Sequence, residues 1–198
     1  IVAGLVIEAV TGNPAHVELR TRLFDPAGTT EVYLAPQESP PAETVSGYVR
    51  GELKTALDFV PGFATYSAEA TVGAFYNVSA IPQEVLRSAG WTGGGVEAQA
   101  EDLARVFRHE FTGALDDATL AEFVTPSEYS NYGLGISVGE LNGYESYSHG
   151  GGVPGFRSHA VHVPELDLTI AVSANLIPIT PDIESLAIAI AEAMIDNL

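Results

Sequence analysis

The feature that most constrains this chain is a run of glycines between two strand-like segments. Residues 148–156 read Ser-His-Gly-Gly-Gly-Val-Pro-Gly-Phe, after Tyr132–Gly135 and before an apolar segment that ends at Asn175. Three adjacent glycines carry no Cβ atoms, so a ligand can approach the main chain directly. Two interpretations follow: a substrate-binding strand with His149 at its mouth, or a glycine hairpin in which His149 is only structural.

The segments around the glycines predict an antiparallel sheet. Gly143, Gly155 and the segment Pro164–Asp167 supply turns, the last of them a type I turn. Because short turns join strands that follow one another in the chain, we expect a meander. Its strands are predicted from apolar and alternating runs at 136–140, 145–149, 157–162 and 168–173.

Helical patterns occupy much of the remaining chain. Ile1–Val10 is apolar and ends at Gly12, and the next helix has Asn13 as its cap and Pro14 at its first position. Three more helices are predicted. The first, Glu101–Phe111, has no hydroxyl at its N-cap, so Glu97 or Gln99 must compensate, and the second has Asp116 or Asp117 as its cap and ends at Phe123. The third has Thr180 as its cap, Pro181 at its first helical position and one apolar face from Ile183 to Met194. The last helix should lie across the sheet.

Residues 44–81 have a weaker pattern and indicate an irregular insertion with short strands at 47–51 and 72–78. Its aromatic side chains either line the rim of a substrate cleft or pack in the protein interior. They are Tyr48, Phe63, Tyr66 and Phe75. With 198 residues and 46% hydrophobic content, the chain can bury a substantial core. We predict that residues 1–198 form the C-terminal portion of one α+β domain, an antiparallel sheet flanked by helices, with a mainly helical part at 1–125 and the sheet and final helix at 126–198.

The charge of the chain argues against nucleic acid as a partner. Asp and Glu total 26 against 8 Lys and Arg, for a formal net charge of −18, and such a surface repels phosphate backbones. The acid excess fits a salty habitat and simple solubility equally well. Without cysteine, the chain has no disulfide, thiolate nucleophile or cysteine-ligated metal. No run approaches the roughly 18 apolar residues of a membrane span.

These motifs resemble those of the serine β-lactamase and penicillin-binding-protein superfamily, especially its class C β-lactamases, D-alanyl-D-alanine carboxypeptidases and esterases. In that family a Lys/His-x-Gly triplet lies on the strand bordering the active site, after Tyr-Gly-Leu-Gly and before Pro-Gly-Phe/Tyr. His149–Gly151, Tyr132–Gly135 and Pro154–Phe156 follow that order. Ala3–Gly12 resembles the buried helix after the family's Tyr-x-Asn motif. Because no capping residue precedes it, we expect the chain to begin inside a larger protein.

The resemblance implies half of an active site. His149 takes the position whose side chain orients a tyrosine hydroxyl and the substrate, and Gly152 takes the position whose backbone N–H is one of two oxyanion donors. Gly150 and Gly151 would border the substrate. Arg157 would pair with a substrate carboxylate or, equally well, with one of the protein's own acids. The implied substrate is a small molecule or a peptide, no cofactor or metal is implied, and family members are usually periplasmic or extracellular.

The family's nucleophile is absent from these residues. It requires Ser-x-x-Lys, which places both side chains on one helix face, but the only lysine, Lys54, has Gly51 at that spacing. Two patterns are decoys. Ser137 matches the Gly-x-Ser-x-Gly elbow of other hydrolases without the helix that an elbow needs, and Tyr129–Asn131 matches Tyr-x-Asn in the wrong place. A zinc site is not expected either, because His159 and His162 should point to opposite faces of one strand.

Two hypotheses remain. The first is the C-terminal part of a serine hydrolase that forms an acyl-enzyme from an amide or ester, with its Ser-x-x-Lys upstream of Ile1. The second is a non-catalytic binding or scaffold domain that keeps the fold without the nucleophile. The residues encoded before Ile1 distinguish the two hypotheses.

Overall fold

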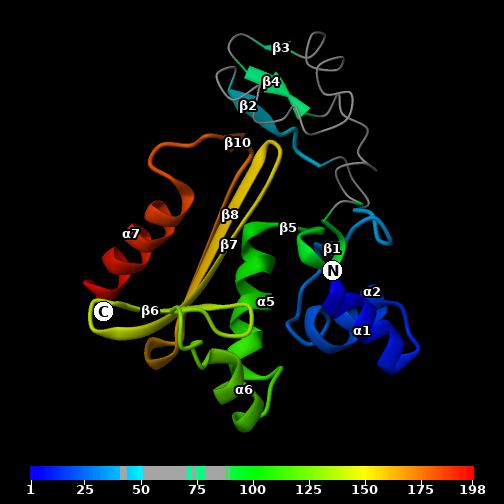
Figure 1. Cartoon of the computed structure of the whole chain (residues 1–198). Coiled ribbons are helices and arrows are strands. Elements are labelled where there is room, and N and C mark those ends of the chain that lie inside the picture. Colours follow the sequence, from blue (N-terminus) through cyan, green and yellow to red (C-terminus); the bar gives the residue numbers. More distant parts are fainter. Residues whose placement is uncertain (41–43, 51–70, 73–74, 79–87, 89) are drawn as a thin grey trace.

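The computed structural model describes residues 1–40, 44–50, 71–72, 75–78, 88 and 90–198. A four-stranded antiparallel sheet lies between helix α7 (Ile183–Ile195) and helix α5 (Ala100–Thr112), and the N-terminal elements pack on the far side of α5 (Figure 1). This arrangement confirms the predicted α+β class. None of the described helices has the length and apolar composition needed to cross a membrane.

The central sheet is the predicted meander. Its strands are β6 (Ser137–Leu141), β7 (Tyr144–Val153), β8 (Phe156–Val163) and β9 (Leu168–Ala174), hydrogen-bonded in that order. A 3₁₀ turn, η5 (Pro164–Leu166), joins the last two. The predicted end of the second strand at His149 is wrong. β7 continues through Gly150–Gly152 to Val153, because each of these residues pairs with β8.

Side chains alternate between the two faces of this sheet, and each face has its own core. Tyr147 and Ala160 pack with Phe107 on the α5 face, while Val161 and Val163 pack with Ala191 on the α7 face. The final helix therefore covers the sheet as predicted. The α5 core continues away from the sheet through Val106, which contacts Phe24 and Val32 near the N-terminus.

The helix ends depend on local contacts, and some of them correct the sequence prediction. Helix α1 (Val2–Thr11) ends at Gly12 with φ 74°, as expected. Helix α2 (Ala15–Leu19) begins after Pro14 rather than at it, and the Asn13 side chain donates to Glu18 instead of capping the helix. A π-helical turn, η1 (Arg20–Phe24), continues α2.

The caps of the later helices follow the same logic. Asp116, one of the two caps predicted for this helix, caps α6 (Asp117–Val124) by accepting the Thr119 N–H. The other two predicted caps differ in outcome. Gln99 lies at the N-cap of α5 but makes no side-chain cap bond, so the prediction for Gln99 is wrong. Asp182, rather than Thr180, caps α7, because its carboxylate accepts the Ser185 N–H.

Two small sheets flank the meander. Strand β1 (Val32–Leu34) pairs with β5 (Val96–Ala98), just after the 3₁₀ turn η4 (Trp91–Gly93), and neither strand was predicted. The other sheet has the strand order β10 (Leu176–Ile177), β2 (Tyr48–Arg50), β4 (Phe75–Asn77) and β3 (Thr71–Val72). β2 lies within the segment predicted at 47–51. The single strand predicted at 72–78 is wrong, because β3 and β4 are separate strands that pair antiparallel, and β10 was not predicted. Phe63 and Tyr66 lie outside the described residues.

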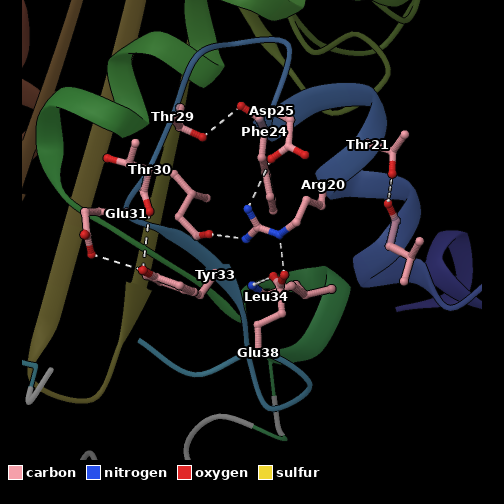
Figure 2. A network of polar contacts seen from close by, with 12 residues as sticks. Arg20, Thr21, Phe24, Asp25, Thr29, Thr30, Glu31, Tyr33, Leu34 and Glu38 are labelled. Atoms are coloured by element: carbon pink, nitrogen blue, oxygen red, sulfur yellow. Dashed lines mark hydrogen bonds and ion pairs between the residues drawn. The ribbon is translucent and has the colours of Figure 1, made fainter. Parts of the chain in front are cut away.

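A polar network fixes β1 against the N-terminal helices (Figure 2). The Arg20 guanidinium donates to Glu38 and, at 2.6 Å, to the Val32 carbonyl, and it lies 5.7 Å from the centre of the Phe24 ring. Glu38 also accepts the Leu34 N–H at 2.8 Å. On the other side, the buried Asp102 of α5 accepts the N–H groups of Thr30 and Glu31 at 3.1 and 2.7 Å. The first turn of α5 is thereby tied to the start of β1.

Candidate active site

The glycine part of β7 forms an open edge of the central sheet. β6 pairs with β7 only from Tyr144 to Ser148, whereas β8 pairs with it as far as Val153. Residues 149–153 are all exposed. From His149 onward, β7 therefore pairs with β8 on one side, and no strand of the described residues pairs with it on the other.

The two turns of the meander decide which amides point to that open edge. Asn142 and Gly143 both have positive φ, as in the two-residue turns that close a hairpin with a hydrogen-bonded pair, here Leu141 and Tyr144. Val153 and Phe156 close the next hairpin across Pro154-Gly155. Hydrogen-bonded pairs alternate along an antiparallel ladder. Even-numbered residues of β7 therefore bond toward β6, and odd-numbered residues bond toward β8.

This alternation has a direct consequence for the glycines. The N–H and C=O groups of Gly150 and Gly152 point toward the β6 side, where none of the strands in the described ranges faces them, while those of His149 and Gly151 bond to β8. The β6 ladder agrees, because the Val138 N–H points away from β7 and donates to the Asn131 carbonyl at 2.8 Å. The free amide at Gly152 is the geometry that an oxyanion donor needs.

The side chain of His149 has one partner that the sequence did not predict. Its Nε2 atom lies 2.9 Å from the hydroxyl of Tyr132, and the two rings are 6.2 Å apart between centroids. By alternation His149 projects from the α5 face of the sheet, two residues after the buried Tyr147. Tyr132 is the first residue of the Tyr-Gly-Leu-Gly motif. That motif indicated the family in the sequence, but it did not predict that the Tyr132 side chain contacts His149.

A tight loop presents Tyr132 to the imidazole. Its main chain is held by hydrogen bonds from Ser127 N–H to the Tyr132 carbonyl, 3.0 Å, and from Leu134 N–H to the Phe123 carbonyl, 2.9 Å. A Cβ atom on Gly133 would lie 2.4 Å from the same Phe123 carbonyl oxygen, and Gly135 has φ 103°. Both glycines are therefore required for the loop, and the loop sets the position of the tyrosine.

Arg157 lies on the opposite face of the sheet from His149. It pairs with Gly152, and a Cβ on that glycine would clash with the Arg157 guanidinium, so the side chain covers Gly152 on the α7 face. The guanidinium donates to the neighbouring Phe156 carbonyl at 3.3 Å. Among the described residues no carboxylate is within ion-pair distance of it.

The other two histidines of the sheet, His159 and His162, are buried. His162 stacks on Phe111 on the α5 face and bonds to Thr169 at 2.8 Å, whereas His159 lies on the α7 face against Gly150. The two point to opposite faces, as their odd spacing predicts. Burial lowers the pKa of both imidazoles, although Glu184 and Asp182 act in the opposite direction on His159. Within the described ranges no group of three or more His, Cys, Asp or Glu could hold a metal ion.

The two decoy patterns lie where the sequence placed them. Ser137 is the first residue of β6, pairs with Ser148 and is followed by strand rather than helix, so the nucleophile elbow is absent. In the Tyr-x-Asn look-alike, Tyr129 is 88% exposed in a turn, and the Asn131 side chain donates to the Val138 carbonyl. Neither pattern contributes to the open edge beside Gly152.

The tip of the β7–β8 hairpin is held by the small sheet, toward which it reaches in Figure 1. A Cβ on Gly155 would lie 2.9 Å from the Gly47 backbone and 2.7 Å from Val78, and one on Gly47 would lie 2.4 Å from Phe156. The Asn175 side chain also donates to the Ser46 carbonyl at 2.9 Å. The two backbones touch through their glycines, which fixes the far end of the open edge.

Comparison with known proteins gives one family and a consistent set of solved structures. A family model described as Beta-lactamase matches residues 1–195. A D-amino acid amidase from Ochrobactrum anthropi SV3, complexed with L-phenylalanine amide, is 20% identical with a TM-score of 0.74 over 100% of this chain and 56% of its own. A D-stereospecific amidohydrolase from Streptomyces sp. is 24% identical, with a TM-score of 0.70 over 96% and 51%.

A penicillin binding protein from Bacillus halodurans is similar to the same degree, at 21% identity and a TM-score of 0.68 over 94% of this chain and 52% of its own. At these identities the likeness concerns the fold. The chain spans about half the length of the solved structures that it matches.

Proposed function

The chain belongs to the β-lactamase family, and from that premise we propose that it is part of a serine hydrolase that cleaves an amide or ester through an acyl-enzyme. The observation that carries the proposal is the Gly152 amide, which lies on an exposed strand edge three residues after His149 and has no partner strand among the described residues. In acyl transfer, the carbonyl oxygen of the substrate becomes an oxyanion, and a fixed backbone N–H stabilises it.

Each residue of the edge has a role in this proposal. Gly152 donates its N–H to the developing oxyanion, which is worth about 3 kcal/mol of transition-state stabilisation. Gly150 and Gly151 have no side chains, so an extended substrate can lie against β7 and pair with the free groups of Gly150. His149 orients the reacting groups from the α5 face.

Arg157 has a separate role in the proposal. Its guanidinium lies over Gly152 from the α7 face and has no carboxylate partner in the described part of the chain. A substrate carboxylate that extends past Gly152 would pair with it.

The attacking hydroxyl comes from other polypeptide in this proposal. None of the serines in the 198 residues is followed by lysine at the third position, and a serine without a nearby base is a weak nucleophile. We therefore assign the Ser-x-x-Lys motif, and the tyrosine that assists it in the family, to polypeptide upstream of Ile1. The names of the similar structures, two of them amidases or amidohydrolases of D-configured substrates, favour an amide of a D-amino acid as the first substrate to test.

The test uses the complete natural gene product that contains these residues. It is incubated with a fluorescent penicillin, and separately with D-phenylalanine amide, and the intact mass is followed with time. We expect a covalent adduct of one acyl group per chain, or release of ammonia from the amide, and a clear reduction of either in His149→Ala. No adduct and no turnover with either compound would favour the alternative, a binding or scaffold domain without a nucleophile.

A further inference from the structure

The contact between Tyr132 and His149 is the one feature of the edge that the proposed mechanism does not use. Tyr132 lies 17 residues before His149, on the loop that enters β6, and the hydroxyl and Nε2 are 2.9 Å apart. Among the described residues no other side chain is hydrogen-bonded to this imidazole. Tyr132 is 39% exposed, so burial alone does not explain its position.

The chemistry of the pair favours one direction for the hydrogen bond. A tyrosine hydroxyl keeps its proton near neutral pH, and a neutral imidazole has one nitrogen that donates and one that accepts. An imidazole nitrogen is a better acceptor than a phenol oxygen, whose lone pair is delocalised into the ring. The hydroxyl therefore donates to Nε2, and the ring proton is left on Nδ1.

We propose that Tyr132 is a positioning residue that holds His149 in its Nδ1–H tautomer, so that the imidazole acts as a hydrogen-bond donor toward the open edge and not as a general base. With Nε2 occupied by the tyrosine, neutral His149 has no free lone pair to accept a proton. Its only remaining polar group is the Nδ1–H. The tautomer rests on the contact alone, whereas its importance for turnover rests on the function proposed above.

The loop around Tyr132 supports a built position for this hydroxyl. Gly133 and Gly135 are needed for close approach and for positive φ, respectively, and the Tyr132 carbonyl is itself bonded to Ser127. The rigid main chain leaves the side-chain torsions of Tyr132 as the main freedom of the pair. A Tyr132 hydroxyl held in place donates to one particular nitrogen of His149. It therefore selects one tautomer, whereas a solvated histidine samples a mixture of two.

The test measures the tautomer directly and does not require activity. The complete gene product is labelled with ¹⁵N, and long-range proton–nitrogen correlations are recorded at pH 8, with His149→Gln to identify the signal. We expect a protonated Nδ1 and an acceptor Nε2 in the native protein, and in Tyr132→Phe a mixture in which the Nε2–H form, the usual one in solution, predominates. Tyr129→Phe is the matched control, since Tyr129 is 88% exposed, and it should leave the spectrum unchanged.

The same variants separate this inference from the proposed function. In turnover, Tyr132→Phe should lower kcat by about three- to tenfold, with little change in KM and a pH profile shifted relative to Tyr129→Phe. An Nε2–H form in the native protein, or the same tautomer before and after Tyr132→Phe, would overturn the inference even if the protein is an active hydrolase. The expected tautomer change without any turnover would support the inference and contradict the proposed function.

Discussion

Replacing Gly152 with proline should lower kcat of the complete protein by about 100- to 1,000-fold, with little loss of stability. Proline removes the N–H that we assign to the oxyanion. That N–H points to the open edge and not to β8, so its removal costs no hydrogen bond of the sheet, and proline is tolerated where a strand amide faces outward. Steady-state kinetics with the best substrate and the midpoint of thermal unfolding measure the two effects.

Two further variants control for the geometry. Gly152→Ala keeps the amide, and the three atoms nearest to its Cβ belong to the flexible Arg157 side chain, which must move aside. With D-phenylalanine amide, which has no carboxylate for Arg157 to bind, this variant should retain most of the activity. Gly151→Pro removes an amide that bonds to β8. Its free energy of unfolding should be about 1–3 kcal/mol lower than that of Gly152→Pro, and it should therefore unfold at a clearly lower temperature. If Gly152→Pro and Gly152→Ala have the same activity, the amide is not an oxyanion donor.

The second large effect concerns stability. Gly155→Ala should lower the free energy of unfolding by about 2–5 kcal/mol, because two costs add. Gly155 has φ 84°, which costs a residue with a Cβ about 1–2 kcal/mol. The new Cβ would also lie 2.7 Å from Val78 and 2.9 Å from the Gly47 backbone, and overpacking costs about 1–3 kcal/mol. Chemical denaturation measures the sum.

Gly143→Ala is the matched control for this prediction. Gly143 has nearly the same φ, 86°, in the neighbouring turn, but nothing lies within 4 Å of the position of its Cβ. It should therefore lose only the conformational part, about 1–2 kcal/mol. Equal losses in the two variants would mean that the hairpin tip does not pack against Gly47, and that the small sheet does not hold the far end of the open edge.

Local chemistry made much of this fold predictable. The turn residues Asn142-Gly143 and Pro154-Gly155 mark both hairpins of the meander, and Asp116 was recognisable as a cap. Where several local partners compete, the prediction was less accurate. Asn13 has a carboxylate partner in Glu18, so it does not cap α2. Asp182 lies closer to the start of α7 than Thr180 and takes over its cap.

The candidate site was predictable in composition but not in geometry. His149 and the three glycines were found from the motif, yet glycine has a low preference for strands, so the extension of β7 to Val153 depends on its pairing with β8. The contact between Tyr132 and His149 depends on a loop that no periodicity describes. The face of Arg157, by contrast, was within reach, because a two-residue turn places it opposite Gly152 and therefore across the sheet from His149.

The measurement that tests the central claim most directly is hydrogen exchange at single-residue resolution along His149–Gly152 in the ligand-free gene product. A free strand edge requires fast exchange at Gly150 and Gly152 and at least tenfold slower exchange at His149 and Gly151, whose amides bond to β8. We predict this alternation. Equal protection at all four amides would show that the edge is already paired, and it would contradict both the oxyanion donor and the substrate position derived from it.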